Sequence, residues 1–227
     1  MTGMTTVRER VRAEVTVEIT DAARRQLAEV GAAALSLRAV ARDVGMVSSA
    51  VYRYFPSRDD LLTRLIIESY DALGGAAEQA DDSSLEPGER WLVVCRAVRG
   101  WARAHPHEYA LLYGSPVPGY QAPPDTVPPA SRVGVVLGRI LADAAATGAL
   151  PEQAGDAGNG LISRDVAQII GGHPAIDDAV RIRALLAWSS IYGAISFELF
   201  GHFVGSVVDA DGFFDRAMAE LAAMVGL

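Results

Sequence analysis

The chain has 227 residues, half of them apolar, and a formal net charge of −8. This length suits one large domain or a small and a larger one, and the apolar content excludes a disordered chain. A single cysteine, Cys95, excludes an internal disulfide, and no signal sequence opens the chain, so we expect a cytoplasmic protein. The longest apolar stretch, Ala184 to Val208, contains Glu198 and His202, which favours a buried helix or a subunit interface over a membrane span.

Charge is distributed unevenly along the chain. Residues 1–64 contain ten arginines and eight acidic residues, a net +2, whereas residues 65–227 contain ten arginines and twenty acidic residues, a net −10. The overall charge argues against a generic nucleic-acid binder. The division nevertheless leaves a mildly basic N-terminal part that can approach DNA, followed by an acidic part that cannot do so comfortably.

The apolar pattern predicts an all-α protein, with no convincing alternating strand. Gly31, Gly45 and Gly148 are placed to end helices, and Ser36 is placed to cap one. Six of the eleven prolines lie between Ser115 and Pro129, which predicts a loop there, and 155–160 reads as a break. We expect helices over 7–30, 37–44, 48–55, 57–80, 89–104, 106–113, 130–147, 161–170, 177–203 and 212–225.

The two short helices around Gly45 have the spacing of a helix-turn-helix. Ala41 is small where the helices cross, and Gly45 supplies the positive backbone angle of the turn. We expect a small core built on Val40, Val44, Met46, Val51 and Tyr54. Hydroxyl and guanidinium groups on the outer face suit phosphate oxygens and base edges, although the same face could be a solvated corner. The candidate DNA contacts are Ser36, Arg38, Arg42, Ser48, Ser49, Tyr52, Arg53, Tyr54, Ser57 and Arg58.

The segment "LSLRAVARDVGMVSSAVYRYFPSRDDLL" (35–62) closely resembles the DNA-binding region of the TetR family of bacterial transcription regulators, and "VYRYFPSRDDL" is its most specific part. The resemblance covers about residues 12–70. It implies a DNA-binding domain over 1–64, with a helix over 57–80 joining it to a ligand-binding and dimerisation domain over 65–227. It also implies a ligand-responsive repressor that binds a palindromic operator as a homodimer, with Tyr52 and Arg58 on phosphates.

One departure from the family pattern concerns the start of the second short helix. Family members usually have serine or threonine just after the turn, whereas this chain has Val47. We expect Ser48 to take over the cap one residue later, with Val47 packing onto Tyr52. Ser49 is then the better candidate for reading bases. Ser49 and Arg53 remain candidates for base edges or phosphates, and Tyr54 for inward packing or a phosphate.

The C-terminal part offers a weaker resemblance. "WSSIYGAISFELFGHF" (188–203) is similar to the Trp-x-x-x-His-Gly type of ligand domain, with Tyr192 in place of the histidine. The family implies an effector bound inside this part, and aromatic side chains favour a small, mainly hydrophobic one, although they could equally be ordinary core. The candidate contacts are Trp91, Cys95, Trp101, Tyr109, Leu112, Tyr113, Trp188 and Tyr192. We expect the homodimer to form through 181–203 and 212–225; the alternative is burial within one subunit.

The sequence leaves two other classes of function to consider, an enzyme and a protein-binding adaptor. An enzyme is not expected, nor a cofactor, because no nucleophilic arrangement can be read from the spacing. His105, His107 and Glu108 have metal-binding side chains, but the break at Pro106 argues against a shared face and no convergent third ligand is visible. The segment "GDAGNG" (155–160) follows no strand and carries no lysine, which argues against a phosphate-binding loop. Cys95 is expected to be buried and inert, with a redox sensor as the alternative. The remaining rival is a helical adaptor whose helix-turn-helix binds protein, which a shallow salt dependence would reveal.

Overall fold

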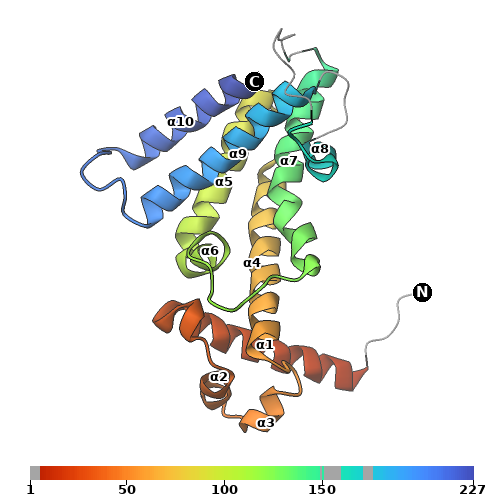
Figure 1. The fold of residues 1–227 in the computed structure, drawn as a ribbon, viewed down its shortest axis with the longest axis vertical. Helices are drawn as coiled ribbons and strands as arrows, with labels where there is room; N and C mark the ends of the chain where they lie inside the picture. The colour runs from red at the N-terminus through yellow and green to blue at the C-terminus, as the bar shows by residue number, and fades with distance from the viewer. Residues whose placement is uncertain (1–5, 149, 151–159, 171–175) are drawn as a thin grey trace. The chain divides into compact units, whose positions relative to one another are not determined.

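The computed structural model describes residues 6–148, 150, 160–170 and 176–227, which are helical without a strand, as the sequence predicts. The chain divides into two compact units, the first containing Met1–Ser69 and His107–Thr126 and the second Tyr70–Pro106 and Val127–Leu227. The elements, of which Figure 1 labels the α-helices, are α1 (Val7–Val30), η1 (Ala32–Ala34), α2 (Leu37–Asp43), α3 (Ser48–Val51), α4 (Arg58–Ala80), α5 (Pro87–Ala104), α6 (Pro106–Tyr113), η2 (Pro124–Thr126), α7 (Val127–Ala146), α8 (Arg164–Ile170), α9 (Asp178–Leu199) and α10 (Ala210–Val225).

Most predicted helices are confirmed, and four boundaries differ by three residues or more; one of them is the start of α8, at Arg164 rather than at 161. The α-helical part of α3 ends at Val51, after which single turns continue to Phe55. α7 begins at Val127, inside the predicted loop, because prolines are tolerated in a first helical turn, where backbone N–H groups lack partners anyway. α9 ends at Leu199 rather than near 203, followed by Gly201 with a φ of +78°. The predicted break over 155–160 falls mainly outside the described residues, and so does the segment "GGHP" (171–174), which the sequence places after the helix predicted over 161–170.

The first unit has a continuous apolar core. It is formed by one face of α1, the buried faces of α2 and α3, and the first turns of α4. Loop residues Val117 and Tyr120 pack against this core from the segment after α6, as does Leu111 of α6 itself. The buried members are Ile19, Ala22, Ala23, Leu35, Leu37, Val40, Ala41, Val51, Phe55, Leu61, Leu62 and Leu65. This core holds α2 and α3 at a defined angle, which is what a recognition surface requires.

The second unit is built around α5, which packs against α7, α9 and α10. Trp91, Val94 and Val98 of α5 are buried among these helices. α8 approaches α7 so closely at Gly138 that an added Cβ would lie 2.4 Å from the backbone oxygen of Ile169. α9 and α10 lie side by side (Figure 1). Among the described residues, no helix is both long and apolar enough to cross a membrane.

Two buried arginines of α5 stabilise the second unit. The side chain of Arg90 is only 4% exposed and donates to Asp81 at 2.8 and 3.2 Å and to Asp143 at 2.8 Å. The Arg99 guanidinium donates to both carboxylate oxygens of Glu198, at 2.7 and 2.8 Å, and lies over the ring of Phe214. Buried charges of this kind are tolerated only when paired, so these contacts constrain how the helices can pack.

Candidate DNA-binding site

The turn between α2 and α3 is organised by backbone hydrogen bonds and one glycine. Gly45 adopts a φ of +67°, as predicted, and its N–H donates to the carbonyl of Arg42 at 3.2 Å. The N–H of Met46 donates to the carbonyl of Ala41 at 2.8 Å, which closes the turn over the buried methyl group of Ala41. Val51 then anchors α3 in the core. The expected apolar residues of this corner are therefore all buried or half-buried against the core.

The expectation about the cap of α3 is wrong. Val47, not Ser48, occupies the N-cap position, and no side chain caps the helix. Ser48 is the first helical residue, and its hydroxyl makes no hydrogen bond within the described chain. The side chain of Val47 is 71% exposed and is therefore not buried against Tyr52. The physical reason is that the Met46 N–H closes the turn onto Ala41, so α3 begins at Ser48 and the valine keeps the N-cap position where family members have serine or threonine.

Three arginines lie unpaired on the outer face of this corner. Arg38 and Arg42 of α2 and Arg53, just after α3, are exposed. Their guanidinium groups form no ion pair or hydrogen bond with any residue that the structure describes. Ser49 is exposed on the same short helix, and Tyr52, at its C-terminal end, is 43% exposed. Cations together with exposed hydroxyl groups suit the phosphates and base edges of duplex DNA.

Two of the other predicted contacts, Ser57 and Tyr54, have partners inside the protein. Ser57 accepts from the backbone N–H of Asp60 at 3.1 Å and donates to its carboxylate at 2.6 Å, which caps the start of α4. Tyr54 packs against the core. Ser36 stands at the N-cap position of α2, but its side chain makes no capping bond, contrary to expectation.

Arg58 has a structural role that its sequence does not reveal. Its guanidinium donates to the carbonyl oxygens of Ala32 at 2.7 Å, Ala33 at 3.0 Å and Leu35 at 3.1 Å. The residue thereby fastens the start of α4 to the turn after α1 and satisfies carbonyl groups at a helix end. Its use as a phosphate contact stays a prediction.

Arg12 is a residue that the sequence analysis missed. Its guanidinium lies over the ring of Tyr54, 5.1 Å from the ring centre, and approaches the backbone carbonyl of Arg53 at 3.4 Å. Both contacts support the end of the recognition helix α3 from α1. The signal available in the sequence was only an exposed arginine on the first helix, because its partners lie about 40 residues away.

The segment after α5 returns to the first unit. Arg24 of α1 donates to Glu108 of α6 at 3.0 Å, to Asp21 at 2.7 Å, and also to Glu68 of α4. The hydroxyl groups of Tyr120 and Thr63 are hydrogen-bonded at 2.8 Å. These contacts tie 107–126 to α1 and α4, although the segment lies within the range that the sequence assigned to the ligand-binding domain.

The candidate effector contacts are mostly buried. Trp91, Cys95, Trp101, Tyr109 and Tyr192 are buried, while Leu112, Tyr113 and Trp188 are half-buried. Burial raises the pKa of the Cys95 thiol well above its usual range, so the sulfur is held as the unreactive thiol. Trp188 and Tyr192 meet edge-to-face with ring centres 5.3 Å apart. Trp91 is 1% exposed, and its indole N–H finds no acceptor among the described residues.

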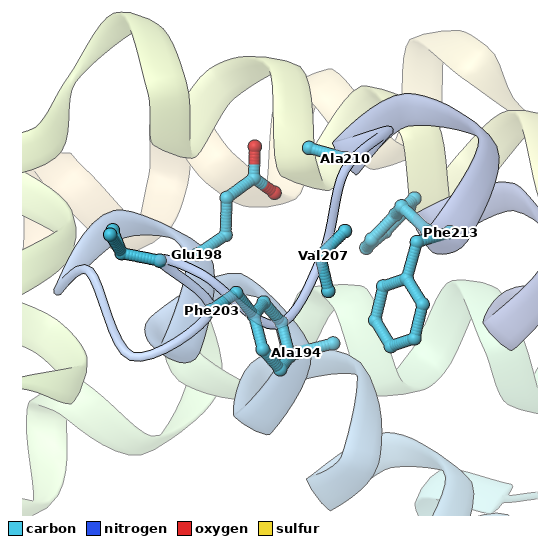
Figure 2. Close-up of a pocket in the computed structure, with 8 residues that line it drawn as sticks. Ala194, Glu198, Phe203, Val207, Ala210 and Phe213 are labelled. Carbon is cyan, nitrogen blue, oxygen red and sulfur yellow. The ribbon is translucent and has the colours of Figure 1, made fainter.

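Two cavities lie elsewhere. One of about 190 Å³, at the junction of α9 and α10, is mainly apolar, and the rings of Phe203 and Phe213 border it (Figure 2). Its single carboxylate, Glu198, is already paired with Arg99. The other, a groove of about 550 Å³ between α1 and α2, is lined by Arg25, Gln26, Glu29, Val30, Ala34, Ala39, Arg42 and Asp43. Neither cavity is lined by the candidate effector contacts. Within the described residues no group of histidine, cysteine or acidic side chains could hold a metal ion.

The fold and the exposed face of α2 and α3 define a helix-turn-helix DNA-binding protein. Residues 19–65 match the bacterial regulatory proteins of the tetR family, and residues 91–221 match the tetracyclin repressor-like C-terminal domain. The second match spans more than half of the chain. The protein therefore belongs to the TetR family of transcriptional regulators, which bind DNA through the helix-turn-helix and are not enzymes.

Individual relatives agree with this assignment. The chain is similar to the HTH-type transcriptional regulator Rv1816 of Mycobacterium tuberculosis (strain ATCC 25618 / H37Rv), with 41% identity over 225 residues, covering 96% of this chain and 94% of the relative. The crystal structure of the regulatory protein SCO4313 superposes with a TM-score of 0.75 and 33% identity, covering 95% and 98% of the two chains. A tetR-family regulator from Rhodococcus RHA1 shares the fold, with a TM-score of 0.63, 18% identity, and coverage of 93% and 96%.

Proposed function

We propose that the protein is a ligand-responsive repressor that binds a palindromic operator as a homodimer. The observation that carries this proposal is the set of exposed, unpaired arginines Arg38, Arg42 and Arg53 around Ser49 and Tyr52. Guanidinium groups left without a protein partner are available for phosphates and guanine edges. We assign DNA binding to residues 1–64.

Dimerisation is supported by α9 and α10. Ala187, Ile191 and Ile195 face the interior of the second unit. The opposite side of α9 exposes further large apolar groups, with Leu186 at 53% and Phe197 at 51%. α10 adds the exposed ring of Phe213, which meets Phe203 with ring centres 5.1 Å apart. An apolar stripe of this extent suits a second copy of the same stripe, and one recognition helix alone contacts too little DNA for tight binding.

An effector site among the buried aromatic residues of 65–227 is supported by the indole N–H of Trp91, which lacks an acceptor within the described chain. A buried donor without a partner is costly, and an oxygen atom of an otherwise apolar effector would satisfy it. Among proteins with this fold, RolR has been solved with resorcinol bound, at 16% identity and a TM-score of 0.55. That likeness concerns the fold alone, so the effector proposed here is defined only as small and mainly apolar.

Coupling between effector and operator requires an element that responds to both. The segment 107–126 follows α5, which carries Trp91 and Trp101. It is hydrogen-bonded to Arg24 and Thr63 of the DNA-binding part, residues 1–64, which we call the head. We propose that effector binding favours a geometry in which the two heads of the dimer no longer fit successive major grooves. A tenfold loss of operator affinity requires about 1.4 kcal/mol of coupling.

The proposal is tested by selecting bound sequences from random duplex DNA with purified protein at two salt concentrations. We expect a palindrome with half-sites about one helical turn apart, whose binding weakens steeply as salt rises. Enrichment that is not palindromic would refute the dimeric arrangement. A complete lack of enrichment, with the protein shown to be folded by circular dichroism, would refute operator binding and favour the protein-binding adaptor.

A further inference from the structure

Val47 occupies an unusual place for an apolar residue. It is the last extended residue before α3, with a φ of −69° and a ψ of 140°, and its side chain is 71% exposed. The two neighbouring apolar residues of the turn, Val44 and Met46, pack against the core instead. The chain therefore turns one apolar side chain outward at the position directly before the recognition helix.

Valine at this position does not serve the helix. The N-cap favours serine, threonine, aspartate or asparagine, and lacking their side-chain bond costs about 0.5–2 kcal/mol. No side chain takes over the cap of α3. With 71% of its surface exposed, Val47 also contributes little to the core. A serine would stabilise α3 better, so neither local structure nor packing accounts for the isopropyl group.

The position of Val47 directly before the recognition helix suggests that its isopropyl group contacts DNA. In a helix-turn-helix, the N-terminal residues of the recognition helix contact base edges in the major groove. Most groups at that surface are hydrogen-bond donors and acceptors, and the one apolar group is the 5-methyl of thymine. An isopropyl group pressed against a polar edge would displace water without replacing its hydrogen bonds, whereas against a methyl group both partners gain from burial.

We propose that Val47 reads the 5-methyl group of a thymine in each half-site of the operator. This inference rests on the proposed function, because it requires α3 to enter the major groove. It predicts that thymine at one position of each half-site is preferred for its methyl group rather than for its hydrogen-bonding pattern. Ser48 and Ser49, whose hydroxyl groups lie next along the chain, would then contact the neighbouring bases or phosphates.

The test uses the full-length protein and the palindrome obtained by selection, with each thymine replaced in turn by deoxyuridine, which removes only the methyl group. For the native protein we expect one symmetric position where this replacement weakens binding about fourfold per half-site, or about fifteenfold when both half-sites are changed, since one buried methyl group contributes about 0.8 kcal/mol. Val47→Ala should weaken binding to the thymine operator similarly and should no longer distinguish thymine from uracil at that position.

Val47→Ser separates the effect on thymine recognition from the effect on stability, because the two should change in opposite directions. It should lose the thymine preference while raising the melting temperature, because serine supplies the missing cap. Val30→Ser is the matched control: Val30 is also an exposed valine of the head, but it lies at the end of α1, so discrimination between thymine and uracil should stay native.

Each outcome decides the proposal. A methyl effect that disappears in Val47→Ala and persists in Val30→Ser supports it. If a palindrome is selected but no position depends on the methyl group, or if Val47→Ala retains the full dependence, the reading by Val47 is overturned while operator binding stands. If no DNA is enriched at all, both the inference and the proposed function fall.

Discussion

The N-terminal head and the acidic remainder contain the same number of arginines but use them differently. Within the described chain, six of the ten arginines in 1–64 form no ion pair, against two of the ten in 65–227. The unpaired ones in the head are Arg8, Arg10, Arg12, Arg38, Arg42 and Arg53. Most arginines in the remainder neutralise neighbouring carboxylates and connect helices, whereas six of those in the head have no carboxylate partner within the described chain. The small net charge of the head therefore understates its capacity for DNA, because pairing and not the sum of charges determines which cations a phosphate can reach.

The largest expected effect concerns a paired arginine of the second unit. Asp81→Asn removes the main carboxylate partner of Arg90, and both side chains are less than 5% exposed. We expect the free energy of unfolding to fall by about 3 kcal/mol, because a buried charge loses its counter-charge. Urea denaturation at fixed protein concentration measures this.

The matched control is Asp215→Asn, which breaks the exposed pair with Arg96. Exposed pairs contribute at most about 1 kcal/mol, so this change should be small. If both variants lose the same free energy of unfolding, burial does not determine how much an arginine–carboxylate pair stabilises this protein.

The next effect concerns an unpaired arginine of the head. Arg53→Ala should weaken operator binding by about 1–3 kcal/mol, about 5- to 150-fold in Kd, and relax the preference at one base position if Arg53 reads a base. A uniform loss across all sequences would assign Arg53 to phosphate. Arg96→Ala is the control, since Arg96 lies on α5, outside the proposed head and dimer interface, and is paired with Asp215, so its removal should leave DNA affinity unchanged. A native affinity for Arg53→Ala would contradict the proposed contact surface.

A finer distinction within the head comes from salt dependence. Arg38→Gln and Arg42→Gln should each make the plot of log affinity against log salt shallower by about one unit if each arginine binds one phosphate. Arg25→Gln provides the comparison, because Arg25 is already paired with Asp43 at 2.6 Å. Filter-binding titrations over a salt series would measure the slopes. If Arg25→Gln changes the slope as much as the other two substitutions, pairing with a carboxylate does not decide which arginines bind phosphate.

The smallest expected effect is on the pH dependence of the free energy of unfolding. Burial acts to raise the pKa of Asp81, but hydrogen bonds and charge from Arg90 and Arg139 outweigh it, so the pKa is lowered from its usual value of 3.8. The unfolded chain then binds this proton at a higher pH than the folded one. The stabilisation is therefore complete above about pH 5 and is lost as pH falls through the folded pKa. Urea midpoints measured from pH 6 to pH 3 should fall less steeply in Asp81→Asn than in the native protein, and parallel curves would contradict this assignment.

Prediction from sequence was reliable for the core of the head. The positions of Val40, Ala41 and Val51 follow from helical spacing around a glycine turn, and all three are buried. It failed at the cap of α3, because the first residue of that helix depends on where the Met46 N–H closes the turn onto Ala41. It also missed that Arg58 donates to carbonyl groups 23 to 26 residues earlier, a contact that no local pattern encodes.

The sequence by itself determined the helices, the helix-turn-helix and the family, because these depend on interactions within a few residues along the chain. Only the tertiary structure decided which arginines are neutralised and which are left for DNA. Three partners of Arg24 and Arg99 lie 44 to 99 residues away in the sequence, at Glu68, Glu108 and Glu198. It also decided that Val47 faces outward, because that orientation is set by which neighbouring residues the core accepts.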